Sequence, residues 1–491
     1  MWTKSTLEKL IFKNLKDYLF VVVSNRQPYI HRFEGKKIKY LRSTSGVAIP
    51  LDPIMKTSQG LWIAHGSGDA DKKVVNKFDH IKLPPDKPKY TLRRVWLTKA
   101  EEDGYYYGFS NEGLWPLCHI AFTRPKFDKP DWETYKKVNQ KFANTILKEI
   151  KNKKAFVFIQ DYHFALLPLF IREKHPDCII AQFWHIPWPN PEAFRICPWR
   201  KQIIRGLLAN DLLGFNIRYY CQNFLDTVND NLEAKVNLEN FEVTRRHHST
   251  LIRSYPISVD YEDLNSLARE KSTTKLINKF QADFNLKNKK IGLGIDRLDY
   301  TKGIPERLRA IEIFLKKNPK YIGKFTFIQI AVPSRTHIQK YKDIKDEIEN
   351  LVEEINFKYQ TNNWKPIIYI KRDHSKKELS ALYNLCHFCI VSALHDGMNL
   401  IAKEFIASRI KENGALILSL FTGSSRELVD ALLVNPYSTY TFARIIKRAI
   451  EMPQTEQRIR MKKMRELVQN NNVYLWAGRI LSDLLKLETS I

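Results

Sequence analysis

The sequence predicts an α/β protein built on doubly wound parallel sheets. Short continuous apolar runs, which suit strands buried on both faces of a parallel sheet, recur along the whole chain. Between them, segments such as 132–150 and 305–316 place apolar residues three and four positions apart, as crossover helices do. The expected strands are 19–24, 155–159, 179–183, 290–295, 325–331, 367–370, 388–391 and 415–418.

Length predicts more than one domain. A chain of 491 residues exceeds the size at which a single hydrophobic core usually stops growing. A boundary is expected near 256–260, where one series of elements closes before the charged segment 261–289 begins a second. No internal repeat or low-complexity tract interrupts either series.

Composition favours a soluble, cytoplasmic protein with no membrane partner. The apolar run 415–421 is far too short to span a bilayer, and the first twenty residues carry Glu8 and Asp17 without a small-residue cleavage pattern. The six cysteines are few for this length and are expected to remain thiols.

A CxxC pair, Cys386 and Cys389, has two interpretations. It fits a metal or redox site only weakly, because no second pair accompanies it. A helix end that leads into the buried strand 388–391 is the interpretation we favour. No Asp-x-Asp or His/Cys cluster has ligand spacing, so we predict no metal ligands and no required cofactor, and leave a divalent ion open as a modulator.

The net charge of +27 raises the question of nucleic-acid binding. The lysines are scattered through surface-like stretches, with Asp283 and Asp343 among them, and no nucleic-acid-binding motif accompanies them. We therefore expect a solvated basic surface, which could also steer anionic substrates, and no nucleic-acid partner.

Two segments point to a phosphorylated ligand. In GIDRLDYTKGIPER, 294–307, a strand runs into Arg297 and Lys302, which could contact phosphate or could be surface charges. In DGMNLIAKE, 396–404, a turn opens a helix whose first amides could hold an anion without side-chain charge.

These segments, with others in the same order, resemble the trehalose-6-phosphate synthase family of retaining glycosyltransferases, glycosyltransferase family 20. The resemblance covers nearly the whole chain. The other matching motifs are VVVSNR (21–26), YYYGFSNEGLWP (105–116), FIQDYH (158–163), FWHIPWP (183–189) and LLGFNIRYY (212–220).

The resemblance implies the GT-B fold, in which two Rossmann-like domains face a cleft. Residues 1–258 would bind the acceptor and 259–472 the nucleotide sugar, while 473–491 would form a helix that packs back on the first domain. The partners implied are a nucleotide diphosphate glucose and glucose 6-phosphate, and a separate phosphatase would be needed to release trehalose. A homo-oligomer is compatible with the sequence.

The resemblance also assigns site residues. Arg297 and Lys302 would stabilise the departing diphosphate, and His185 and Asp161 would contact the transferred sugar and the acceptor. Glu404 would bind the ribose, where the alternative is an ordinary surface glutamate. The other donor residues implied are Gly46, Asp396, Gly397, Met398, Asn399, Leu400 and Ile401; the acceptor residues are Arg26, His65, Tyr106, Trp115, Asp161 and Arg335.

Several positions leave alternatives open. A lone histidine such as His185 is more often structural, and Tyr106 and Trp115 could be core aromatics. The family's paired glycines appear here as Ser45 and Gly46, and the usual arginine before Asp396 is His395.

His65 stands where a tryptophan commonly lies in the acceptor pocket of the family. The acceptor side is therefore less fully matched than the donor side. This departure keeps open transfer to another phosphorylated acceptor such as glycerol 3-phosphate. Two alternatives from other classes are a sugar-nucleotide sensor without turnover and nucleic-acid binding through the basic surface.

Overall fold

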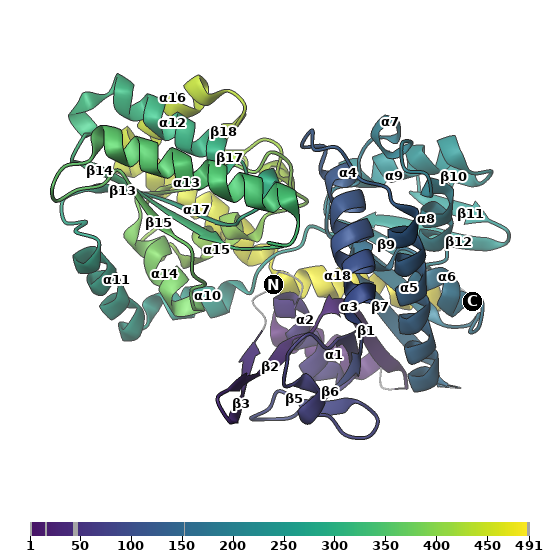
Figure 1. Ribbon diagram of the computed structural model, residues 1–491. Helices are drawn as coiled ribbons and strands as arrows, with labels where there is room; N and C mark the ends of the chain where they lie inside the picture. The colour runs from purple at the N-terminus through teal and green to yellow at the C-terminus, as the bar shows by residue number, and fades with distance from the viewer. Residues whose placement is uncertain (1, 15–16, 43–47, 152, 489–491) are drawn as a thin grey trace. The chain divides into compact units, whose positions relative to one another are not determined.

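The computed structural model describes residues 2–14, 17–42, 48–151 and 153–488 (Figure 1). The described chain divides into two compact units. Unit 1 runs to Pro256 and resumes at Val473, and unit 2 is Ile257–Asn472. The described residues include no helix that is both long enough and apolar enough to cross a membrane.

Unit 1 is built on a ten-stranded sheet in the order β10-β11-β12-β9-β8-β7-β1-β4-β6-β5. The strands from β12 to β6 run parallel, and antiparallel pairs close both edges. Its strands are β1 Leu19–Arg26, β4 Leu61–His65, β5 His80–Leu83, β6 Tyr90–Val95, β7 Ala155–Gln160, β8 Ile179–Trp184, β9 Leu212–Phe215, β10 Lys235–Asn237, β11 Glu242–Arg245 and β12 His248–Ser254. Because the chain winds away from β1 in both directions, the strand order reverses between β1 and β7.

Helices cover this sheet, and a separate hairpin, β2 Tyr29–Glu34 with β3 Lys37–Arg42, follows β1. The helices of unit 1 are α1 Lys4–Asn14, α2 Ala48–Ser58, α3 Lys99–Glu102, α4 Trp115–His119, α5 Lys129–Ile150, α6 Leu167–Arg172, α7 Pro191–Phe194, α8 Arg200–Leu207, α9 Arg218–Asn231 and α18 Val473–Glu488, with a π-helix at Asp103–Leu114 and short 3-10 turns at Asp71–Lys73 and Tyr162–Phe164.

The last helix, α18, belongs to unit 1 although it follows unit 2 in sequence. Its Trp476 lies 5.3 Å from Phe183 of β8 and 6.1 Å from Phe158 of β7, measured between ring centroids. Tyr255 Oη donates a 2.8 Å hydrogen bond to Asp483 Oδ2. The chain end is therefore fixed to the sheet of unit 1 by apolar packing and by a hydrogen bond.

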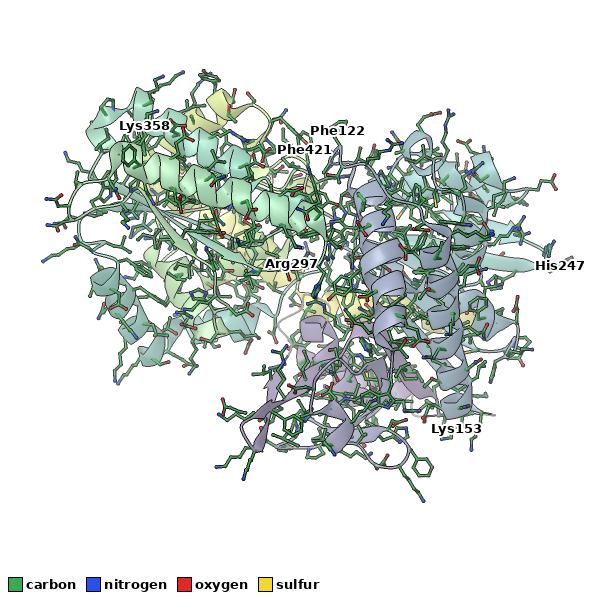
Figure 2. The ribbon with its side chains drawn as sticks, viewed as in Figure 1. Phe122, Lys153, His247, Arg297, Lys358 and Phe421 are labelled. Atoms are coloured by element: carbon green, nitrogen blue, oxygen red, sulfur yellow. The ribbon has the colours of Figure 1, made fainter. Side chains whose placement is uncertain are left out.

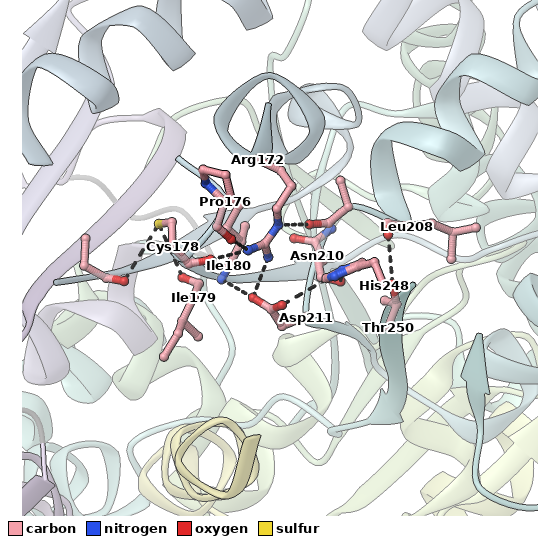
Figure 3. Close-up of polar contacts among 12 residues, drawn as sticks. Arg172, Pro176, Cys178, Ile179, Ile180, Leu208, Asn210, Asp211, His248 and Thr250 are labelled. Carbon is pink, nitrogen blue, oxygen red and sulfur yellow. Dashed lines mark hydrogen bonds and ion pairs between the residues drawn. The ribbon is translucent and has the colours of Figure 1, made fainter. Parts of the chain in front are cut away.

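Arg172 fixes the amino ends of β8 and β9 (Figure 3). Its Nη2 donates to Asp211 Oδ2 at 2.7 Å, its Nη1 donates to the Cys178 carbonyl at 2.7 Å, and the Ile180 amide donates to the same Asp211 oxygen at 2.7 Å. Because ligands of doubly wound sheets bind at the carboxyl ends of strands, this network at the opposite ends has a structural role.

Unit 2 is built on a six-stranded, wholly parallel sheet in the order β15-β14-β13-β16-β17-β18. Its strands are β13 Lys290–Arg297, β14 Phe325–Val332, β15 Ile367–Ile370, β16 Phe388–Val391, β17 Ala415–Ser419 and β18 Leu432–Val434. Its helices are α10 Tyr261–Arg269, α11 Lys271–Asp283, α12 Ile304–Lys317, α13 Gln339–Tyr359, α14 Lys376–Leu385, α15 Leu400–Ser408, α16 Thr439–Glu451 and α17 Gln454–Asn470, with 3-10 turns at Tyr300–Lys302, Pro319–Tyr321 and Gly423–Arg426. The strand order reverses between β13 and β16.

Two hydrophobic clusters lie on the two faces of this sheet. One joins side chains of α10, α11, α14, α15 and α17 to the sheet, and the other joins α12 and α16 to it. Helices on both faces of a parallel sheet are the arrangement that the buried apolar runs predict, so the predicted α/β class and the eight predicted strands are confirmed.

The sequence did not predict the other strands, which are β2, β3, β4, β5, β6, β9, β10, β11, β12 and β18. In β6 the apolar run is broken by Arg93 and Arg94, yet Arg94 is fully buried. Its Nη2 lies 2.8 Å from Asp71 Oδ1, and its Nε donates to Gln27 Oε1 at 2.9 Å. A strand that buries a paired charge has no continuous apolar run, so apolar runs do not predict it.

Candidate active site

The carboxyl end of β13 carries the first predicted cations of unit 2. Arg297, labelled in Figure 2, is the last residue of β13, and its side chain is 38% exposed. The turn Tyr300–Lys302 follows, and Gly303, with φ +61°, leads into α12. A Cβ on Gly303 would lie 2.2 Å from the Ser392 carbonyl oxygen, so this turn requires glycine.

Lys302 contacts the second predicted segment. Its Nζ donates to Asp396 Oδ2 at 2.5 Å, and the two side chains are 9% and 16% exposed. Asn399 Nδ2 donates to the same carboxylate oxygen at 3.1 Å. Asp396 lies in the loop after β16, and β16 is the neighbour of β13, so the reversal of strand order brings the two predicted segments together.

The turn after Asp396 opens a helix, as predicted. Asn399 has φ +69° and precedes α15, which begins at Leu400. The Asp396 amide donates to the Phe421 carbonyl at 3.0 Å, and the Ser424 amide donates to the Met398 carbonyl at 3.1 Å. These bonds fix the turn. The first amides of α15 have no acceptor within the helix, so they are available to an anion.

Further contacts place the remaining donor residues. The Gly397 carbonyl packs so closely that a Cβ on Gly423 would lie 2.0 Å from it. Ile401 is in the first turn of α15. Gly46 and its neighbour Ser45 lie outside the described residues.

Asp299 joins two predicted cations, and sequence reasoning missed it. Its fully buried Oδ2 is 3.8 Å from Arg297 Nη2 and 3.6 Å from Arg335 Nη1. Burial alone would raise the pKa of Asp299, but Arg335, Arg297 and Lys302 together hold that pKa below its ordinary value. The carboxylate is therefore charged at neutral pH and fixes both arginines.

Arg335 is more enclosed than Arg297. Its side chain is only 4% exposed, its backbone has φ +51°, and its guanidinium donates to Tyr341 Oη. Tyr341 comes from α13, a segment in which the sequence suggested no site residue.

In unit 1, predicted acceptor residues end neighbouring strands. Arg26 is the last residue of β1 and is paired in register with His65, the last residue of β4. Arg26 is exposed, and its Nη2 donates to Tyr106 Oη at 3.2 Å. The Tyr106 ring stacks on His163, with 5.7 Å between centroids and 13° between planes. The structure thus brings Arg26, His65 and Tyr106 together at the carboxyl ends of β1 and β4.

His65 and Trp115 are both interior side chains. His65 is 8% exposed, and burial lowers its pKa to about 4. Trp115 is 5% exposed, and its ring centroid lies 4.0 Å from that of His119 and 5.9 Å from that of Tyr162. His65 is therefore neutral at pH 7.

His185 and Asp161 contact each other at the carboxyl ends of β8 and β7. The His185 amide donates to Asp161 Oδ1 at 3.2 Å, and His185 Nε2 lies 3.0 Å from Gln160 Oε1. Asp161 adopts φ +73°. Burial lowers the pKa of His185 to about 3, so the imidazole is neutral and offers hydrogen bonds rather than charge.

Glu404 lies one helical turn after Leu400 on α15. Its Oε2 accepts a 2.9 Å hydrogen bond from Tyr383 Oη, a residue of α14 that sequence reasoning missed. A ribose bound as predicted would therefore share the Glu404 carboxylate with a protein hydroxyl.

The CxxC pair has the structure that we favoured. Cys386 directly follows α14, Cys389 lies in β16, and both side chains are buried free thiols. Burial raises the pKa of Cys386 to about 12, so this thiol is protonated and unreactive.

With the geometry described, the chain can be compared with known proteins. A sequence model described as glycosyltransferase family 20 matches residues 18–486. An alpha,alpha-trehalose-phosphate synthase (UDP-forming) from Candida albicans is 33% identical over 472 residues, which cover 95% of this chain and 97% of that protein.

Two solved structures match nearly the whole chain. One, described as trehalose-6-phosphate from E. coli bound with UDP-2-fluoro glucose, has a TM-score of 0.85 and 31% identity and covers 95% of this chain and 98% of its own. The other, an alpha,alpha-trehalose-phosphate synthase (UDP-forming) from Burkholderia xenovorans in complex with glucose-6-phosphate, has a TM-score of 0.85 and 29% identity and covers 95% and 99%.

Proposed function

The chain belongs to glycosyltransferase family 20, and from that premise we propose that it transfers glucose from UDP-glucose to glucose 6-phosphate with retention, forming trehalose 6-phosphate. Both units are Rossmann-like, which confirms the GT-B fold that the resemblance implied. The relatives support both substrates, because one is UDP-forming, one structure holds a UDP-glucose analogue and another holds glucose 6-phosphate. Uridine is thereby the proposed base, which the sequence left open.

The observation that carries the proposal is the contact between Lys302 and Asp396, which joins the segment after β13, the strand that ends at Arg297, to the turn that opens α15. In the reaction, an acceptor hydroxyl bonds to the anomeric carbon as the bond to the diphosphate breaks, and its proton passes to a diphosphate oxygen. Arg297 and Lys302 would stabilise the charge that develops on the leaving group. The bond to Asp396 takes one of the three N–H donors of Lys302, so the same ammonium can also contact phosphate.

We base the other proposed roles on the family resemblance. Asp396 and the turn 397–399 would bind the hydroxyls of the donor sugar, and the amides at the start of α15 would bind the diphosphate. In unit 1, Arg26 would bind the phosphate of the acceptor, with Tyr106 beside it. Neutral His185 and Asp161 would hydrogen-bond the sugars.

Product analysis tests the proposal. Purified protein is incubated with UDP-, ADP- or GDP-glucose and with glucose 6-phosphate, glycerol 3-phosphate or glucose, and products are identified by mass spectrometry. A disaccharide phosphate formed from UDP-glucose and glucose 6-phosphate is the expected result. Transfer to another acceptor would overturn the substrate assignment, and binding of UDP without transfer would favour the sensor.

His65→Trp tests the acceptor side, where this chain departs from the family pattern. A larger aromatic face beside Arg26 packs better on a hexose than on glycerol. We expect the ratio of kcat/KM for glucose 6-phosphate over glycerol 3-phosphate to rise about tenfold, the size of one favourable aromatic contact. His247→Trp, at an exposed turn labelled in Figure 2, is the control. An unchanged ratio would show that His65 does not set acceptor choice.

The proposal extends to the setting of the enzyme. We propose a cytoplasmic enzyme that needs no resident metal or cofactor, with a separate phosphatase releasing trehalose from its product. Activity before and after EDTA treatment checks the role of a divalent ion. Light scattering of the purified protein determines whether it forms the homo-oligomer with which the sequence is compatible.

A further inference from the structure

A single hydrogen bond connects α14 to the carboxylate of Glu404. Tyr383 Oη donates to Glu404 Oε2 at 2.9 Å. Tyr383 is 1% exposed, whereas Glu404 is half-buried on α15. One carboxylate oxygen is therefore held from inside the protein, while the side chain keeps partial access to solvent.

Tyr383 is itself fixed at several points. Its carbonyl accepts a 2.6 Å hydrogen bond from Arg409 Nη1. Its ring packs against Phe405, at 6.2 Å between centroids and 68° between planes, within the core of unit 2. At the other end of α14, Ser375 and Glu378 form a capping box. The position of the hydroxyl is therefore set by the core and does not depend on a ligand.

The protonation state of Tyr383 suits a fixed donor. Burial raises the pKa of Tyr383 well above its ordinary value, so the hydroxyl keeps its proton. Burial also raises the pKa of Glu404, and the hydrogen bond from Tyr383 opposes that rise. A carboxylate bonded through Oε2 cannot rotate freely, so its Oε1 is held in one direction.

We propose that Tyr383 is a positioning residue for the nucleotide ribose, because its hydroxyl orients the Glu404 carboxylate before the ligand arrives. The inference rests on the proposed function and on the role that the family resemblance implies for Glu404, which is binding of the nucleotide ribose. Without Tyr383 Oη the carboxylate has to lose rotational freedom on binding, and this cost weakens the complex. The role goes beyond packing because it acts only on ligands that carry ribose hydroxyls.

Tyr383→Phe tests the inference, since it removes only the hydroxyl. Calorimetry measures the Kd of the full chain for UDP and for 2′,3′-dideoxy-UDP, which lacks the ribose hydroxyls. We expect the Kd for UDP to rise about threefold to tenfold, within the range for ordering one side chain on binding, and the Kd for the dideoxy compound to stay unchanged. KM for UDP-glucose should rise with that Kd, while KM for glucose 6-phosphate stays unchanged.

Two further variants make the test decisive. Tyr369→Phe removes a buried hydroxyl of unit 2 that has no hydrogen-bond partner among the described residues, and it should leave both Kd values unchanged. Glu404→Gln should weaken UDP binding itself. If Glu404→Gln weakens UDP binding but Tyr383→Phe does not, or if Tyr383→Phe weakens both ligands equally, the positioning role is wrong. If Glu404→Gln leaves UDP binding unchanged, the ribose assignment fails and the positioning role fails with it.

Discussion

Replacing Arg297 with alanine is expected to lower kcat for glucose transfer by about 100-fold to 1000-fold, the usual cost of removing one charge-stabilising donor from an active site. The bond to the diphosphate breaks with charge accumulating on its oxygens, and Arg297 is the more exposed of the two cations at this point, at 38%. Steady-state kinetics with saturating UDP-glucose and glucose 6-phosphate measure the change.

Unit 2 should remain folded in this variant. Asp299, which Arg297 contacts, keeps Arg335 at 3.6 Å and is therefore not left as an unpaired buried charge. Arg309→Ala is the matched control, because Arg309 is an exposed arginine of α12 whose side chain forms an ion pair with Glu347. Undiminished turnover in Arg297→Ala would remove this residue from the proposed mechanism, whereas loss of turnover in Arg309→Ala as well would indicate a general effect of charge.

The parts of the fold that the sequence predicted are those with local signals. Apolar runs such as Val21–Val23 mark strands buried on both faces, and all three residues are fully buried in β1. A turn followed by a helix was predicted at 396–404 because its local sequence indicates a helix start, and α15 begins at Leu400. Neither inference requires knowledge of distant residues.

The parts that the sequence could not predict depend on contacts between distant residues. Tyr383 and Glu404 are separated by 21 positions, and Arg297 and Arg335 share Asp299 only because β13 and β14 are neighbours. The motif spacing indicated which cations were present but not which carboxylate would hold them. The strand β6 was not predicted because it contains charged residues, and the partners that allow Arg94 to be buried come from other parts of the chain.

Arg307→Ala is expected to destabilise unit 2 by about 3–5 kcal/mol, the cost of leaving one member of a buried ion pair uncompensated. Arg307 is fully buried, and its Nη1 donates to Asp296 Oδ2 at 2.8 Å and to Gln329 Oε1 at 2.9 Å. Its Nε donates to Ser392 Oγ at 3.0 Å. One guanidinium thus links α12 to β13, to β14 and to the loop after β16.

Hydrogen exchange measures this change within unit 2. Amides of β13 and β14 should exchange about 100-fold to 4000-fold faster in Arg307→Ala, as the lost free energy requires. Arg309 is exposed and lies two residues further along the same helix. In Arg309→Ala the amides of β13 and β14 should exchange at the rate of the unsubstituted protein.

The pH dependence identifies the cause of this destabilisation. Burial already raises the pKa of Asp296, and Arg307 opposes the rise, so the pKa should climb further when Arg307 is removed. A carboxyl whose pKa is higher in the folded state than in the unfolded state binds a proton preferentially in the folded state, so its contribution to stability grows as pH falls. The loss in free energy of unfolding caused by Arg307→Ala should therefore become smaller between pH 8 and about pH 5. Adding Asp296→Asn to this variant should restore much of the lost free energy at pH 8. If the loss in free energy of unfolding stays constant with pH and is not reduced by Asp296→Asn, the destabilisation comes from the cavity left by the Arg307 side chain and not from the buried charge of Asp296.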